Sequence, residues 1–80
     1  MNVGNGHDPF ENGFDPELQK VLRETFAHAL SDLTPEITDG NRAAVEAAVS
    51  DALIALAKVG QRNPEQLRHY GVYKGRQLLP

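Results

Sequence analysis

Apolar side chains recur every three or four positions along two long stretches of the chain, which is the spacing of one side of an α-helix. In the first stretch, about residues 16–33, the apolar positions are Leu18, Val21, Leu22, Phe26, Ala29, Leu30 and Leu33. In the second stretch, about residues 42–59, they are Val45, Ala48, Val49, Ala52, Leu53, Leu56 and Val59. Because a short connector joins the two stretches, the pattern predicts an all-α chain built on an antiparallel helical hairpin.

The ends of both helices carry residues that commonly begin or end helices. Asp15 and Pro16 are typical of the cap and the first position of the first helix. Asn41 is the expected cap of the second helix, and Gly60 is typical of its end, because glycine adopts the left-handed conformation without strain. The bounds predicted from these residues agree with those predicted from the spacing of the apolar side chains.

A third start signal follows at Asn63 and Pro64. Because Gly71 follows closely, we expect only a short third helix, over about residues 64–70. The remaining residues, 71–80, contain two glycines and show no clear period. They are therefore expected to form a basic and aromatic C-terminal tail.

The second helix is apolar around most of its circumference, and its additional apolar positions are Ala43, Ala44, Ala47, Ile54 and Ala55. A helix of this kind is usually contacted on two sides, whereas a hairpin alone covers only one of them. We therefore expect a homodimer in which two hairpins form a four-helix assembly. The self-association surface is predicted at Ala43, Ala47 and Ile54. A monomer that keeps this surface for another protein is the alternative.

The N-terminal residues 1–14 contain three glycines and three asparagines and show no helical or alternating apolar period. They are expected to form a flexible arm, because ordering them would bury little apolar surface. Within this arm, Phe10 and Phe14 are a secondary candidate for docking to a partner. In the alternative, Phe14 folds back over the start of the first helix and Phe10 contributes little.

Charge is distributed unevenly along the chain. Residues 1–57 carry ten acidic and three basic side chains, whereas residues 58–80 carry one acidic and five basic side chains. The basic end also contains both tyrosines of the chain, and arginine and tyrosine are among the residues that most often anchor interfaces. The predicted partner-binding residues are Arg68, Tyr70, Tyr73, Lys74 and Arg76.

Several kinds of chemistry are not expected from this sequence. The chain has no cysteine, which excludes disulfides and thiolate metal sites. His7, His28 and His69 are too far apart to form a ligand pair on one helix, so no metal or cofactor is expected. Glu24 lies one helical turn before His28, but such a pair on a polar helix face is usually a weak surface interaction. The sequence has no catalytic motif, membrane-spanning stretch or leader pattern, so we expect a cytoplasmic protein without enzymatic activity.

These patterns predict a small protein–protein interaction module, a regulator, adaptor or inhibitor that acts by surface contact. Its helical domain is expected over residues 15–70, and its partners are a second copy and another protein. The alternative is a nucleic-acid-binding regulator, because basic side chains and tyrosines in the C-terminal segment are suited to contact phosphates and bases. The acidic remainder of the chain weighs against this alternative.

Overall fold

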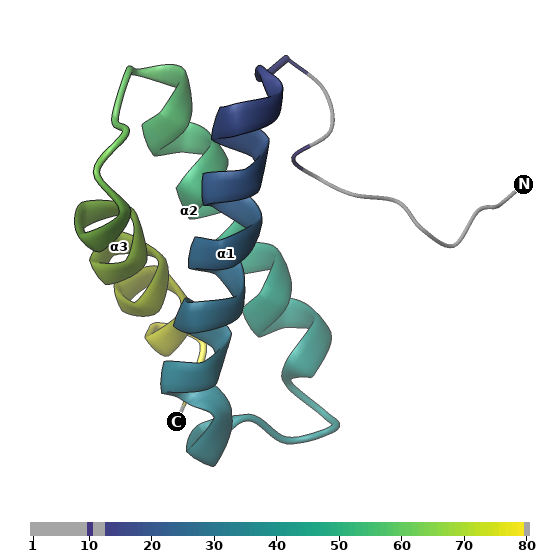
Figure 1. Ribbon diagram of the computed structural model, residues 1–80. Coiled ribbons are helices and arrows are strands. Elements are labelled where there is room, and N and C mark those ends of the chain that lie inside the picture. The colour runs from purple at the N-terminus through teal and green to yellow at the C-terminus, as the bar shows by residue number, and fades with distance from the viewer. Residues whose placement is uncertain (1–9, 11–12, 80) are drawn as a thin grey trace, which may run out of the picture.

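The computed structural model describes residues 10 and 13–79, and three α-helices account for most of them. Helix α1 covers Pro16–Leu33, helix α2 covers Arg42–Lys58, and helix α3 covers Pro64–Arg76. Helices α1 and α2 run antiparallel, and α3 lies beside them (Figure 1). The predicted all-α class and the bounds of the first two helices are confirmed, and the described residues contain no strand. None of these helices is long and apolar enough to cross a membrane.

The third helix completes the core of the molecule. The fully buried large side chains are Phe10, Leu22, Leu33, Leu53, Leu67, Val45 and Val49. Helix α3 packs against both α1 and α2, and each of these contacts is more extensive than the contact between α1 and α2 themselves. The predicted antiparallel pair is therefore one part of a three-helix fold.

Helix α3 is longer than the sequence predicts, because it continues through Gly71 and ends at Arg76. Gly71 and Gly75 are both buried. A Cβ added to Gly75 would lie 2.7 Å from Leu33 Cδ1 and 2.9 Å from Val49 Cγ2, closer than side chains normally approach. The glycines therefore allow the α3 backbone to pack closely against α1 and α2 instead of ending the helix. The prediction of a tail that begins at residue 71 is wrong.

The predicted caps are present at the starts of α1 and α3. The Asp15 carboxylate accepts a hydrogen bond from the backbone N–H of Leu18 at 2.9 Å. The Asn63 side chain accepts hydrogen bonds from the backbone N–H groups of Glu65 at 2.8 Å and Gln66 at 3.2 Å. These bonds satisfy backbone donors that have no partner within the first turn of a helix.

The side chain of Asn41 does not cap α2 as predicted, because it makes no hydrogen bond to the first turn of that helix. It makes hydrogen bonds within the connector instead. Its Oδ1 accepts a hydrogen bond from the Thr38 N–H at 2.7 Å, and its Nδ2 donates one to the carbonyl of Glu36 at 3.3 Å. Glu36 ends the 3-10 turn η2, Thr34–Glu36, which follows α1 directly. The end of α2 agrees with the prediction, since Gly60 has a φ of +97°.

Phe10 belongs to the core although it precedes α1. Its side chain is 1% exposed, and its ring meets the ring of Phe26 edge-on at a centroid distance of 5.7 Å. A docking role for Phe10 needs an exposed ring, so that prediction is wrong. Phe14 is half-buried and packs against the same core, which agrees with one part of the alternative. The other part of the alternative, that Phe10 contributes little, is wrong, because Phe10 is a core residue. Residues 1–9 and 11–12 of the predicted arm lie outside the described residues.

The residues of the predicted self-association surface have two different environments. Ala43 and Ala47 are exposed, whereas Ile54 is half-buried and packs against the core of its own chain. Helix α3 also gives α2 a second neighbour within one chain. A second copy is thus not needed to explain the apolar character of α2, and the homodimer stays a prediction.

Candidate functional site

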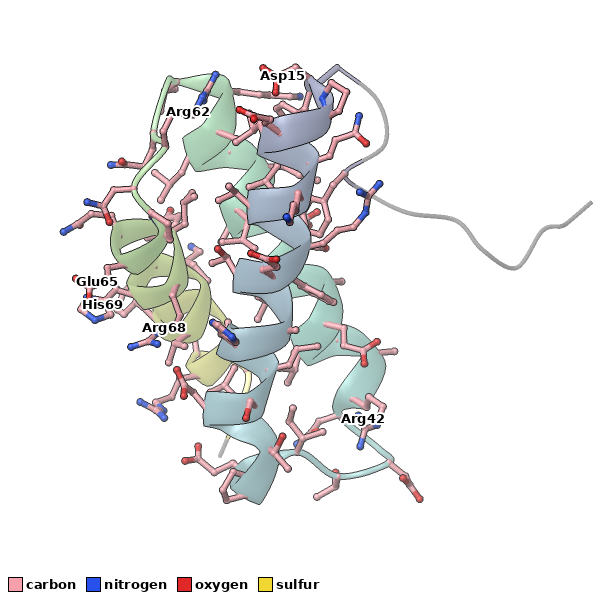
Figure 2. The ribbon with its side chains drawn as sticks, viewed as in Figure 1. Asp15, Arg42, Arg62, Glu65, Arg68 and His69 are labelled. Atoms are coloured by element: carbon pink, nitrogen blue, oxygen red, sulfur yellow. The ribbon has the colours of Figure 1, made fainter. Side chains whose placement is uncertain are left out.

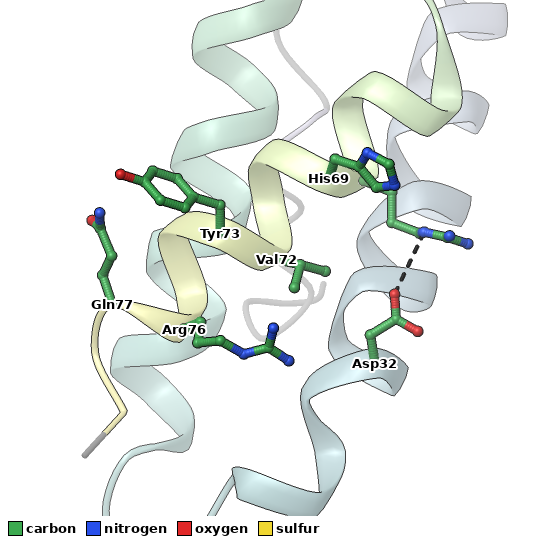
Figure 3. A pocket seen from close by; sticks show the side chains of 7 residues that line it. Asp32, His69, Val72, Tyr73, Arg76 and Gln77 are labelled. Carbon is green, nitrogen blue, oxygen red and sulfur yellow. Dashed lines mark ion pairs between the residues drawn. The ribbon is translucent and has the colours of Figure 1, made fainter.

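An open pocket of about 590 Å³ lies between the C-terminal half of α1 and the outer side of α3. Its lining residues are Asp32, Arg68, His69, Val72, Tyr73, Arg76 and Gln77. We call this pocket the α1–α3 groove. Most of its surface is apolar, and charged groups are present on both helices that form it (Figure 3).

The groove forms because α3 has one buried side and one exposed side. Leu67, Gly71 and Gly75 recur every four residues and are all buried, so one side of the helix faces the core. Val72 and Arg76 follow these glycines by one position and lie on the neighbouring side. Figure 3 shows both side chains pointing from α3 towards α1. The packing of the glycines therefore sets how far the groove residues stand from α1.

Two ion pairs connect the arginines of α3 to acidic side chains of α1 and η2. Arg68 Nε lies 3.5 Å from Asp32 Oδ2, and Arg76 Nε lies 3.6 Å from Glu36 Oε1. All four side chains are between 39% and 55% exposed, so each pair contributes at most about 1 kcal/mol to stability. Their main consequence is positional, because each holds a guanidinium at the groove.

The guanidinium of Arg68 has unused hydrogen-bonding capacity. Its Nε atom is buried and makes no hydrogen bond, although the Asp32 carboxylate lies close enough for an ion pair. The ion pairs of Arg68 and Arg76 both involve Nε, and a guanidinium carries four further N–H donors on its terminal nitrogens. Both arginines are thus able to bind an additional acceptor.

Two tyrosines and a lysine form a cluster on α3 beside the groove. The rings of Tyr70 and Tyr73 stack at a centroid distance of 6.4 Å and an interplanar angle of 27°. Lys74 Nζ lies 6.0 Å from the centroid of the Tyr70 ring. Tyr73 is 58% exposed and lines the groove, whereas Tyr70 and Lys74 are half-buried and do not line it.

All five predicted partner-binding residues therefore lie on one helix, and three of them line the groove. These three are Arg68, Tyr73 and Arg76. The predicted set did not include Asp32, His69, Val72 and Gln77, which also line it. The sequence contains a signal for Val72, because it lies four residues after Arg68 and four before Arg76. Residues with this spacing lie on the same side of a helix. That signal becomes visible only if the helix is continued through Gly71.

Two further arginines, Arg42 and Arg62, lie away from the groove. Arg42 is near the start of α2, where it pairs with Glu46 at 3.8 Å, and Arg62 is at the opposite end of the molecule (Figure 2). Arg62 donates a hydrogen bond to the carbonyl of Ala57 at 3.1 Å, and this contact satisfies an acceptor in the last turn of α2.

The histidines of the helices are exposed and belong to different parts of the surface. His28 lines a second, smaller pocket of about 170 Å³ together with Glu65 and Arg68, whereas His69 lines the α1–α3 groove. No three His, Cys, Asp or Glu side chains in the described part of the chain are placed to hold a metal ion. His7 lies outside that part.

Comparison of the chain with protein-family models, with curated proteins and with solved structures gives no match.

Proposed function

We propose that this chain is a small non-enzymatic protein-binding module and that its α1–α3 groove binds a segment of another protein. The observation that carries the proposal is a mostly apolar groove in which the exposed ring of Tyr73 lies on the same helix as two arginines. Tyrosine and arginine are enriched among residues that dominate binding energy. We place the module in the cytoplasm, since a chain without cysteine does not need an oxidising compartment.

The charges around the groove favour a protein over a nucleic acid. Arg68 and Arg76 each have a carboxylate within 3.6 Å, from Asp32 and Glu36. Nucleic-acid binding depends strongly on neutralising many phosphates with basic side chains, whereas the lining of the groove contains two arginines, each already paired with a carboxylate. The whole chain is also acidic, with a net charge of −3. The stacked tyrosines and Lys74 are the features that support the nucleic-acid alternative.

Site-specific photo-crosslinking in cells tests the proposal. A benzophenone amino acid replaces Tyr73 in the groove, and in a control it replaces Ala27, which is exposed on α1 and does not line the groove. We expect a protein adduct at position 73 and not at position 27. Combining the probe with Arg68→Glu and Arg76→Glu should remove the adduct, because both charges at the groove are then reversed.

Two results of this experiment would contradict the proposal. Adducts that contain nucleic acid at position 73 would favour the alternative function. Protein adducts that survive the two arginine substitutions would show that the partner does not use the groove.

We also propose that the module forms a homodimer through the outer surface of α2. Ala43 and Ala47 are exposed there, and small side chains allow close helix packing. Ala47→Glu should shift a dimer to monomer in sedimentation experiments without disturbing the core, with Ala27→Glu on α1 as the control. A sedimentation profile that is monomeric and independent of dilution for the unsubstituted protein would refute this proposal.

A further inference from the structure

We infer that the segment bound in the α1–α3 groove is an acidic amphipathic helix that carries two carboxylates about two turns apart, with a large apolar side chain between them. This inference rests on the proposed function and adds the chemistry of the partner to it.

The backbone of α3 indicates that the bound segment is helical. Its N–H and C=O groups are used within the helix, and the described residues contain no strand edge. An extended peptide usually gains its affinity by adding a strand to such an edge, whereas an amphipathic helix binds a groove through its side chains alone. The groove therefore fits a helix better than a strand.

The groove also offers apolar surface on α3. Val72 is half-buried and Tyr73 is more than half exposed, and both line the pocket. A leucine, methionine or phenylalanine of the partner would remove this surface from water, which is the main source of affinity in helix-in-groove complexes. A wholly polar segment would leave it uncovered.

Two guanidinium groups with free terminal N–H donors lie along the groove at a fixed spacing. Arg68 and Arg76 are eight residues apart on one helix, which corresponds to about 12 Å along the helix axis. Val72 lies midway between them. A partner helix aligned with α3 presents side chains at the same separation when they are seven or eight residues apart, because that spacing also spans about two turns.

The two arginines are suited to bind carboxylates. The Nε contacts with Asp32 and Glu36 hold each guanidinium in place, and the planar group still has terminal donors for a second carboxylate. Figure 3 shows the guanidinium of Arg76 extending from α3 across the groove towards α1. A partner with one acidic residue for each arginine satisfies both guanidinium groups.

A set of matched synthetic peptides tests this inference. The probe is a fluorescent peptide of about 18 residues, long enough to be helical in water, with glutamates at positions i and i+7 and leucines at i+3 and i+4. One control replaces both glutamates by glutamine, and a second places a proline between the leucines. Anisotropy titration should show binding of the probe, with affinity at least about tenfold lower for each control.

Charge reversal on the protein gives a second, independent measurement. Arg68→Glu combined with Arg76→Glu should weaken binding of the glutamate peptide by more than about tenfold. A peptide with lysines in place of the two glutamates should bind the double variant better than it binds the unsubstituted protein. Arg42→Glu, away from the groove, is the matched control and should leave both affinities unchanged. If the double variant is unfolded by circular dichroism, Arg68→Gln with Arg76→Gln replaces it, and that pair should likewise weaken binding.

The results separate this inference from the proposed function. Equal binding of the glutamate and glutamine peptides, tighter binding of the proline peptide, or no binding of the probe would overturn the acidic helix. If the benzophenone at position 73 still forms a protein adduct that depends on the two arginines, the groove remains the binding site for a partner of different chemistry. Loss of that adduct would overturn both.

Discussion

The two sides of α3 differ in what they contribute to the molecule. On the buried side, Leu67, Gly71 and Gly75 pack against α1 and α2, and two of these three residues have no side chain beyond the backbone. On the exposed side, long side chains line a groove. A helix that packs through glycines approaches its neighbours closely, so the arginines on the adjoining side of α3 come within 3.6 Å of acids on α1 and η2. The close packing of α3 therefore forms the groove as well as the core.

Removing the largest side chain of the buried side should have the greatest effect on folding. Leu67 is 0% exposed, and Leu67→Ala should lower the free energy of unfolding by about 3 kcal/mol through lost burial and a cavity. Chemical denaturation followed by circular dichroism measures this change. A loss below about 1 kcal/mol would mean that α3 is not packed as described.

Gly75→Ala should be the next most damaging substitution on this side. The added methyl group would lie 2.9 Å from Val49 Cγ2, and β-branched Val49 has little freedom to move away. Because the methyl group would also lie 2.7 Å from Leu33 Cδ1, we expect an overpacking cost in the upper part of the usual range, about 2–3 kcal/mol. Higher helix propensity returns about 1 kcal/mol, which leaves a net loss of about 1–2 kcal/mol. Equal or higher stability of the variant in urea denaturation would contradict the close approach.

Shortening a side chain on the exposed side should have little effect on folding and a large effect on binding. Tyr73→Ala should change the free energy of unfolding by about 0.5 kcal/mol or less, because the ring is 58% exposed. The affinity for the glutamate peptide should fall at least about tenfold by anisotropy, since tyrosine is a frequent interface anchor. Val59→Ala is the control, because Val59 is 80% exposed and lies outside the groove. Unchanged peptide affinity of the Tyr73 variant would contradict the assigned site.

Gly71→Ala should have the smallest effect of the series. A Cβ at this position would lie 3.2 Å from Val49 Cγ1 and 3.4 Å from Leu53 Cδ2, which small movements relieve. The cost should approximately cancel the gain of about 1 kcal/mol from higher helix propensity. Thermal unfolding should therefore give nearly the same midpoint for the variant and the unsubstituted protein. A loss as large as that of Gly75→Ala would show that both glycines are equally constrained.

The sequence predicts the parts of the fold whose signals lie close together along the chain. Helix α1 carries its cap, its proline and its apolar stripe within one stretch of chain. A glycine can end a helix, or it can let a helix pack closely against its neighbours. Gly71 and Gly75 have the second role. Their environment is set by Val49 and Leu33, which are distant in sequence. The burial of Phe10 likewise depends on its contact with Phe26.

The candidate site was predictable only in part for the same reason. Arg68, Tyr73 and Arg76 were selected by residue type and local charge, and all three line the groove. Asp32 and Glu36 were not selected, because nothing in the sequence brings α1 and η2 next to the arginines until α3 is known to be a full helix. The groove is formed by α1 and α3 together, whereas the charge and aromatic pattern that selected the site lies on α3 alone.

The most direct test of the central claim, that the groove side of α3 is the binding surface, is NMR observation of the arginine side chains. The Nε–H signals of Arg68 and Arg76 are followed while the glutamate peptide is added, with Arg42 and Arg62 as internal controls away from the groove. We predict that the signals of Arg68 and Arg76 shift with the same dissociation constant and that the two control signals stay in place. Shifts at Arg42 or Arg62 with none at Arg68 and Arg76 would contradict the claim.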